Sequence, residues 1–186
     1  FLEKEPGSKI VHDPRVIWNT RDIVTKMGGI PIQSKTGHSY VKKVMREHNA
    51  IYGGEMSAHH YFRDFAYCDS GMIPWMLMAE FLSNTDRKIS DLIKERVEAF
   101  PSSGEINYLV DDPNYSIGKV LEHFEDSSYS LDKSDGVSIN FNEWRFNLRV
   151  SNTEPLVRLN IESRNDFESI TILENSIAVL LGGKKI

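Results

Sequence analysis

The sequence is poor in cysteine, in net positive charge and in long apolar runs. Its 186 residues include one cysteine, Cys68, which excludes an internal disulfide and a zinc site built on several cysteines. Such usage fits a reducing compartment, so we expect a cytoplasmic protein. The net charge of −5 argues against nucleic acid as a partner, because phosphate backbones attract basic surfaces. The most apolar stretch, residues 72–79, is too short to cross a bilayer, so no membrane partner is expected.

The chain also lacks an initial methionine. It begins at Phe1, and residues 1–4 have the pattern of the last turn of a helix. We therefore expect the chain to be cut from a longer protein, near a junction between domains. Its 40% hydrophobic content is ample for a packed core.

Short strands alternate with helices in the first half, which predicts an α/β domain with a mixed sheet over residues 1–98. Ser39 is the expected N-cap of the second helix. The expected strands are 9–12, 30–32 and an aromatic stretch over 61–67, and residues 51–52 lead into two glycines. The expected helices are 18–27, 41–48, 72–82 and 89–100.

The pattern changes after a turn cluster at residues 101–104, which predicts a domain boundary there. Beyond it, apolar and polar residues alternate along several segments, as in strands with one face in the core and one in water. We predict a small α+β domain over residues 102–186, with a four-stranded antiparallel sheet and two helices. Ser116 is the expected N-cap of the first helix, and Asp166 is expected to open the second.

The turn over residues 149–155 combines a guanidinium group with hydroxyl and amide groups. Alternation places Arg149 on the polar face at the end of a strand, and Ser151, Asn152 and Thr153 follow in the turn. Such donors, with the backbone N–H groups of a tight turn, are what a phosphate dianion needs. The same residue types are common in ordinary hairpins, so that alternative stays open.

The segment over residues 53–60 joins two glycines to a polar stretch. Glu55, Ser57 and His59 alternate, so in an extended chain they project to one side. A carboxylate, a hydroxyl and an imidazole together suit sugar hydroxyls, although a strand with a partly buried histidine is the alternative. His59 and His60 would point in opposite directions on a strand, and no other ligand has fitting spacing, so no metal site is predicted.

Two further positions are weaker candidates for anion contact. His38 closes a polar turn over residues 35–38, just before a predicted helix whose N-terminus would attract anions. Arg15 follows Asp13 and Pro14, and a solvated arginine is its ordinary alternative.

Together these segments resemble the α-D-phosphohexomutases, and the resemblance covers essentially the whole chain. The family's sugar-recognition loop resembles Gly54-Glu55-Met56-Ser57-Ala58-His59. The family's phosphate-binding loop resembles Arg149-Val150-Ser151-Asn152-Thr153-Glu154-Pro155. A further segment of the family resembles Lys35-Thr36-Gly37-His38. A methionine at this position of the sugar-recognition loop, Met56, resembles the bacterial branch of phosphomannomutases and phosphomannomutase/phosphoglucomutases.

The family has four domains, of which the first carries a phosphorylated serine and the second a magnesium loop of alternating aspartates. Neither motif occurs in this chain. The resemblance therefore implies the third and fourth domains only, with the missing N-terminal domains of the same protein as partners. It also implies Mg²⁺ whose ligands lie outside this chain, and a hexose 1,6-bisphosphate as activator and intermediate.

The resemblance implies an intramolecular phosphotransferase of the isomerase class that interconverts mannose 6-phosphate and mannose 1-phosphate through a phosphoserine, for GDP-mannose synthesis. The isolated chain would be inactive, because it lacks the serine and magnesium loops. The alternatives are a phosphoglucomutase or dual-specificity phosphohexomutase, and a module that binds sugar phosphates without turning them over.

The resemblance also implies roles for residues. Glu55 and Ser57 would hold sugar hydroxyls, with His59 beside them. Arg149, Ser151, Asn152 and Thr153 would hold the phosphate that is not reacting. His38 would lie near the transferred phosphoryl group, and Arg15 would give electrostatic support.

Two residues depart from the family pattern. Ala58 stands where many members have glycine, and an alanine there is expected to keep a negative φ. Arg15 stands where relatives often have a lysine suggested as a general base, and a guanidinium group that stays protonated is a poor base.

Overall fold

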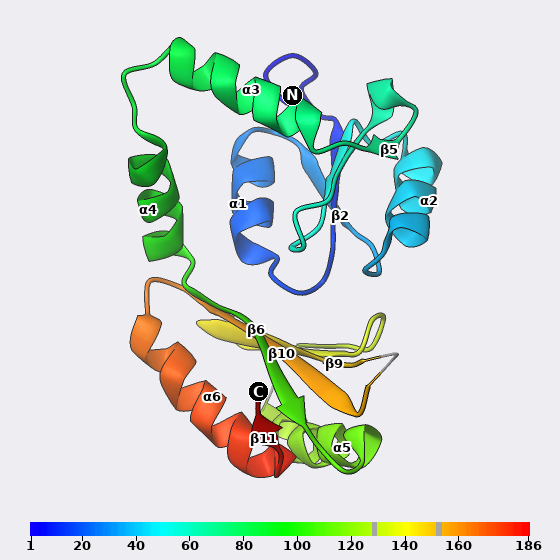
Figure 1. The fold of residues 1–186 in the computed structure, drawn as a ribbon, viewed down its shortest axis with the longest axis vertical. Coiled ribbons are helices and arrows are strands. Elements are labelled where there is room, and N and C mark those ends of the chain that lie inside the picture. Colours follow the sequence, from blue (N-terminus) through cyan, green and yellow to red (C-terminus); the bar gives the residue numbers. More distant parts are fainter. Residues whose placement is uncertain (128–129, 152–153) are drawn as a thin grey trace. The chain divides into compact units, whose positions relative to one another are not determined.

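A computed structural model describes residues 1–127, 130–151 and 154–186 of the chain. The described chain forms two compact units, residues 1–96 and residues 97–186 (Figure 1). The sequence-based ranges were 1–98 and 102–186. In the described residues, no helix combines the length and the apolar character that crossing a bilayer requires.

The first unit is built on a five-stranded mixed sheet with the strand order β2-β1-β3-β4-β5. The strand β1 runs parallel to β2 and β3, whereas β4 and β5 are antiparallel to their neighbours. The strands are β1 (Lys9–His12), β2 (Ile30–Gln33), β3 (Tyr52–Gly54), β4 (His60–Phe62) and β5 (Cys68–Asp69). A 3₁₀ turn, η1 (Arg63–Phe65), interrupts the predicted aromatic strand between β4 and β5. The predicted mixed-sheet α/β domain is confirmed.

Four helices belong to this part of the chain: α1 (Trp18–Lys26), α2 (His38–His48), α3 (Met72–Ser83) and α4 (Ile89–Ala99). All four were predicted within two or three residues. The predicted cap at Ser39 is wrong, because α2 already begins at His38 and Gly37 occupies the N-cap position. Gly37 has a φ of 117°, a conformation open to glycine and closed to most other residues.

The side chains of α2 pack on the central strands of this sheet. Val41 and Met45 are fully buried against Val11 of β1 and Tyr61 of β4. A side chain on Gly53 would approach Met45 Sδ to 2.7 Å, so glycine allows the helix to lie this close to β3. The close packing fixes the start of α2 beside the loop that follows β3.

The second unit contains a six-stranded antiparallel sheet with the order β11-β6-β10-β9-β8-β7. The strands are β6 (Ser102–Leu109), β7 (Ser130–Asp132), β8 (Val137–Asn140), β9 (Trp144–Val150), β10 (Leu156–Ser163) and β11 (Lys184–Lys185). The prediction of four strands is therefore wrong. Both added strands, β7 and β11, are edge strands of two or three residues, too short for alternation to show.

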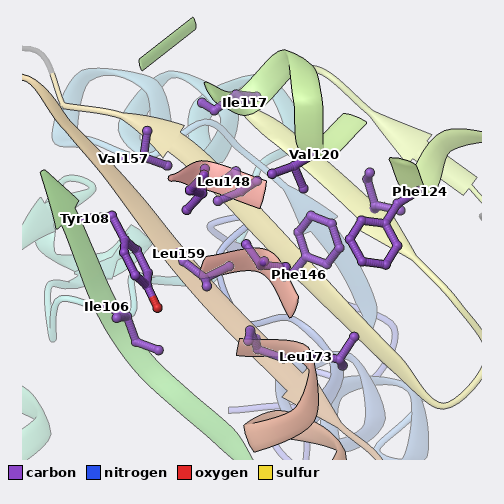
Figure 2. Close-up of a cluster of buried hydrophobic side chains, with 14 of the residues drawn as sticks. Ile106, Tyr108, Ile117, Val120, Phe124, Phe146, Leu148, Val157, Leu159 and Leu173 are labelled. Atoms are coloured by element: carbon purple, nitrogen blue, oxygen red, sulfur yellow. The ribbon is translucent and has the colours of Figure 1, made fainter. Parts of the chain in front are cut away.

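Two helices, α5 (Pro113–Phe124) and α6 (Phe167–Leu181), pack on one face of this sheet as predicted, and a 3₁₀ turn, η2 (Glu125–Ser127), follows α5. Figure 2 shows the core between these helices and the sheet, where Val120 and Phe146 are fully buried. Asp166 caps α6 as predicted. The cap of α5 is Asp112 instead of Ser116, whose buried hydroxyl donates to the Leu181 carbonyl and so joins the two helices.

The opposite, polar face of the second sheet is largely buried in the described chain, although alternation predicted a wet face. Arg145 and Glu162 form an ion pair of 2.7 Å and are 1% and 2% exposed. Arg145 Nε also donates to Asn140. The charges on this face therefore neutralise one another within the sheet, which a pattern of polar and apolar letters does not reveal.

Candidate functional site

The loop between β3 and β4 turns sharply at residues 55–58. The Ala58 N–H donates to the Glu55 carbonyl at 3.0 Å, and Ala58 has a φ of 63°. Both the extended geometry and the negative φ predicted for this segment are therefore wrong. The turn separates the directions of Glu55 and Ser57, so that Glu55 is buried while Ser57 is exposed.

Glu55 joins the loop to two other elements. Its Oε1 accepts a hydrogen bond of 2.7 Å from the Gly37 N–H at the start of α2, and its Oε2 accepts one of 2.5 Å from the Tyr61 hydroxyl. Burial, together with the bond to this carboxylate, raises the pKa of Tyr61. Tyr61 therefore stays a hydrogen-bond donor at neutral pH, and Glu55 is held in one orientation beside His38.

Arg15 reaches the same loop from the end of β1. Its Nη2 donates to Ser57 Oγ at 3.3 Å and to Asp13 Oδ2 at 2.6 Å, and its Nε donates to the same Asp13 oxygen at 3.0 Å. Asp13 Oδ2 also accepts the Met56 N–H at 2.8 Å. Arg15 is 6% exposed, so the solvated arginine that sequence allowed is wrong. Asp13 thus orients both the guanidinium group and the loop backbone.

His38 and His59 lie side by side. Their ring centroids are 4.4 Å apart, and the Tyr61 ring lies 5.2 Å from that of His38 with its edge toward it. His59 Nδ1 is 2.8 Å from Asp69 Oδ2, and His38 Nε2 is 4.0 Å from the same oxygen. Burial opposes ionisation of Asp69, but hydrogen bonds from His59 and from the His60 N–H lower the pKa of this carboxyl overall.

A cavity of about 220 Å³ lies behind the loop. Its polar wall includes Asp13, Glu55 and His60, and its apolar wall includes Val11 and Val16. The Tyr52 hydroxyl, also in its wall, is hydrogen-bonded to His60 Nδ1 at 2.6 Å. Burial raises the pKa of Tyr52 to about 12, so this hydroxyl stays protonated at neutral pH.

In the second unit, Arg149 lies near the end of β9 on the polar face. It stands directly opposite Arg158 of β10, and the two guanidinium groups share Glu105, at 3.9 Å from Arg149 and 3.3 Å from Arg158. Asp135 lies 4.0 Å from Arg149. Two neighbouring arginines therefore share this part of the polar face with two carboxylates.

The turn after Arg149 is described in part. Ser151 is buried, and its N–H donates to the Leu156 carbonyl at 2.9 Å, which closes the turn. Asn152 and Thr153 lie outside the described residues. The structure therefore brings Arg15, His38, Glu55, Ser57 and His59 together in the first unit, and places Arg149 and Ser151 in the second.

Three residues of these sites were missed by sequence reasoning. Arg158 could have been found, because it alternates with the apolar residues Val157 and Leu159 and so belongs to the polar face. Asp13 was noticed only as a neighbour of Arg15. Asp69 had no signal at all, because β5, which contains it, is two residues long.

Mg²⁺ takes oxygen ligands in octahedral geometry. Within the described ranges, the only group of three or more His, Cys, Asp or Glu side chains with converging ligand atoms is His38, His59 and Asp69. Two of these three ligands are imidazole nitrogens. The described part of the chain therefore does not fit a magnesium site.

Comparison with known proteins gave two family matches. Residues 1–100 match the family model described as phosphoglucomutase/phosphomannomutase, alpha/beta/alpha domain III, and residues 105–178 match phosphoglucomutase/phosphomannomutase, C-terminal domain. The expected third and fourth domains of this family are thereby confirmed.

Individual relatives are similar along almost the whole chain. The chain is 55% identical over 181 residues to a phosphomannomutase of Escherichia coli (strain K12), covering 97% of this chain and 40% of that protein. It is 54% identical over 183 residues to a protein named phosphohexose mutases from Xanthomonas campestris pv. campestris (strain B100), covering 98% of this chain and 41% of that one. The chain thus spans about 40% of the length of these relatives.

A solved structure has the same fold. A crystal structure of a phosphoglucomutase/phosphomannomutase family protein from Burkholderia thailandensis superposes with a TM-score of 0.81 at 27% identity, over 99% of this chain and 40% of that one.

Proposed function

Because the chain belongs to the phosphoglucomutase/phosphomannomutase family, we propose that it is the substrate-binding part of a phosphomannomutase, which interconverts mannose 6-phosphate and mannose 1-phosphate. In this cytoplasmic reaction, a phosphoserine outside the chain donates its phosphate to the hexose phosphate. The resulting hexose bisphosphate returns its other phosphate to the serine, and the mannose 1-phosphate supplies GDP-mannose synthesis. The observation that carries the proposal is the convergence of Arg15, His38, Glu55, Ser57 and His59, which are distant in sequence.

The first unit recognises the sugar. Glu55 keeps acceptor capacity beyond its bonds to Gly37 and Tyr61, since an ionised carboxylate has about four lone-pair sites. The exposed Ser57 hydroxyl both donates and accepts, and the half-exposed imidazole of His59 lies on the same loop. These groups hold hydroxyls in place while the reacting phosphate changes from one end of the sugar to the other.

Arg15 and His38 support the transferred phosphoryl group. Arg15 stays cationic, and Asp13 fixes its orientation, so it stabilises negative charge without acting as a base. His38 presents an exposed ring at the start of α2, where the positive end of the helix also favours an anion.

The second unit binds the phosphate that is not reacting. Arg149 and Arg158 offer guanidinium groups on one face of the sheet, and the Ser151 turn begins beside them. Asn152 and Thr153 complete this loop in the proposal. Charge-assisted hydrogen bonds of this kind are about twice as strong as neutral ones.

Mg²⁺ and a hexose 1,6-bisphosphate activator are proposed for the longer protein. The described residues of this chain do not fit Mg²⁺, so its ligands are assigned to the domains that precede this chain in the family, as is the reacting serine.

The role of Arg149 is tested in the longer protein. Arg149→Ala should lower kcat/KM for mannose 1-phosphate by roughly 30-fold or more, because a charge-assisted phosphate contact is lost. This corresponds to a loss of at least about 2 kcal/mol of transition-state stabilisation. The matched control is Arg87→Ala, which removes an exposed arginine paired only with Glu95 in the described contacts and should leave kcat/KM unchanged. An unchanged kcat/KM in Arg149→Ala refutes the phosphate role.

The isolated chain should show no mutase activity. A purified sample of residues 1–186, assayed with mannose 1-phosphate, Mg²⁺ and a hexose 1,6-bisphosphate, should give no turnover above a blank. Binding of the substrate without turnover, measured by calorimetry, is the expected companion result. Turnover by the chain alone would show that the missing serine and magnesium loops are not needed.

A glucose-preferring or dual-specificity mutase is the second candidate, since the Xanthomonas campestris relative named phosphohexose mutases is as similar as the phosphomannomutase of Escherichia coli. Values of kcat/KM for mannose 1-phosphate and glucose 1-phosphate, measured side by side on the longer protein, separate the two. A non-catalytic sugar-phosphate module would show binding and no turnover even in the longer protein.

A further inference from the structure

Three side chains from separate elements meet at the rim of the sugar loop. His38 comes from the first turn of α2, His59 from the loop before β4 and Asp69 from β5. One ligand atom from each lies within 4.8 Å of the other two. The three residues are 10 to 31 positions apart in sequence, so no short motif announces the group.

The distances are close to those of a metal site. Bonds of about 2.0–2.1 Å to a tetrahedral ion place neighbouring ligand atoms about 3.4 Å apart. His59 Nδ1 is 2.8 Å and His38 Nε2 is 4.0 Å from Asp69 Oδ2, which brackets this value. Each of the two distances therefore differs by about 0.6 Å from the spacing that a tetrahedral ion requires.

The orientation of the Asp69 carboxylate is fixed by a backbone hydrogen bond. The His60 N–H donates to Asp69 Oδ1 at 2.9 Å, which leaves Oδ2 facing the two histidines. A backbone bond to the second oxygen of a ligating carboxylate is typical of metal sites, because it fixes the direction of the ligand. The His38 ring in turn contacts the rings of both His59 and Tyr61, which limits its rotation.

We propose that His38, His59 and Asp69 form a three-ligand site for a divalent transition-metal ion of the zinc type, with its remaining position open to water or a phosphate oxygen. Imidazole nitrogen with one carboxylate suits Zn²⁺, whereas Mg²⁺ prefers oxygen ligands only. The side chains of His38 and His59 are 47% and 42% exposed, so an ion can reach them from solvent.

The site has a consequence for substrate binding. A metal ion occupies His38 Nε2 and His59 Nδ1, which then make no hydrogen bonds to a sugar phosphate. A ligated imidazole keeps its second ring nitrogen as an N–H donor, so the ion changes which atoms of His38 and His59 can contact a sugar phosphate, and a phosphate oxygen can take the open position. The metal site rests on the geometry of three residues and stands whether or not the proposed mutase activity does.

The test is calorimetric titration of ZnCl₂ into residues 1–186 in a non-chelating buffer at neutral pH. We expect one zinc ion per chain at this site and no displacement by millimolar Mg²⁺. His59→Ala and Asp69→Asn should each weaken binding by at least tenfold, on the order seen when metal-site groups are lost. The control His123→Ala removes an exposed histidine of α5 and should leave binding unchanged.

A second measurement identifies the ligands without relying on variants that could misfold. Long-range ¹H–¹⁵N spectra should show zinc-induced shifts at His38 Nε2 and His59 Nδ1 and none at His123. His59→Gln, which keeps a polar side chain of similar length, should lose the shift at His38 as well. Zinc binding that His59→Ala and Asp69→Asn leave unchanged, or an absence of zinc binding to the intact chain, overturns the proposal.

Discussion

Ala58 has a backbone conformation that alanine rarely adopts. Its φ of 63° is in the left-handed region, which costs an L-residue with a β-carbon about 1–2 kcal/mol. The side chain is exposed, so packing does not offset this cost. The strained residue lies between Ser57 and His59, which are both proposed to bind sugar. It closes the turn that sets the directions of Glu55 and Ser57.

Ala58→Gly should stabilise the first unit by about 0.5–1 kcal/mol, because relief of strain exceeds the extra chain entropy of glycine. The measurement is urea unfolding followed by the indole N–H resonances of Trp18 and Trp75, which belong to this unit. The matched control is Ala79→Gly in the interior of α3, where glycine should destabilise by about 1 kcal/mol. Destabilisation by both substitutions would mean that Ala58 is not strained.

At the residue scale, the sequence indicated which side-chain chemistries the candidate site contains, but it did not indicate the directions of those side chains. The candidates Glu55, Ser57 and His59 were found from their chemistry, yet their predicted common side is wrong because the chain turns at Ala58. A turn with positive φ was not foreseeable from an alanine, since the residue itself argues against it. The position of Asp69 near His59 depends on the pairing of β5 with β4, and a strand of two residues is too short to be predicted from its sequence.

At the element scale, Arg96 ties α4 to α1. Its Nη2 donates to Asp22 Oδ2 at 2.8 Å and its Nε donates to Asn19 Oδ1 at 2.7 Å. None of the residues of α4 is buried, so apolar packing contributes little to holding this helix. The hydrogen bond from Arg96 lowers the pKa of Asp22, with a smaller contribution from Lys26, while burial opposes the change.

Arg96→Ala should lower the amide-exchange protection of α4 about fivefold, equivalent to about 1 kcal/mol for a partly exposed pair with two hydrogen bonds. The same loss should occur in the unchanged chain at low pH. Because the folded pKa of Asp22 is below its unfolded value, the pair stabilises α4 above the ordinary aspartate pKa and fails as pH falls through the lowered one.

The readout is hydrogen exchange of α4 peptides by mass spectrometry, with Arg87→Ala as control. Arg87 pairs with Glu95 at the exposed surface, so its removal should change protection far less. If protection of α4 is equal in the two variants, the contact between Arg96 and α1 does not hold the helix.

Elements with strong periodicity were predicted correctly, whereas the two shortest strands of the second sheet were missed. The helices α5 and α6 and the strands β9 and β10 show clear periods, because one face of each meets a core, whereas α3 and α4 were predicted although no residue of either is buried. The strands β7 and β11 exist only through pairing at the sheet edges, for example Lys184 with Leu109. Ser116 was misread as a cap because a serine hydroxyl also serves a buried contact, here with Leu181.

At the scale of the whole molecule, the two units differ in how they are stabilised. Among its described residues, the second has one continuous core of sixteen buried side chains between its sheet and the helices α5 and α6. The first has two smaller clusters and a helix, α3, in which no residue is buried. The change of pattern in the sequence indicated two domains, but it gave no measure of this difference in core size.

Residues 97–186 should therefore fold alone. The cut falls within α4 and keeps two hydrogen bonds that join the segment before β6 to the rest of this unit, from the Ser163 N–H to the Pro101 carbonyl and from the Asn165 N–H to the Ala99 carbonyl. We expect a cooperative thermal transition, with near-ultraviolet circular dichroism from Trp144 and Phe146, which lie 6.3 Å apart in the core. The Trp144 indole resonance should match its position in the longer chain, and Phe146→Ala should abolish the transition or lower its midpoint strongly, since such a truncation costs about 3–5 kcal/mol. A fragment with helical far-ultraviolet signal but no near-ultraviolet signal would show that this core needs the first unit to order it.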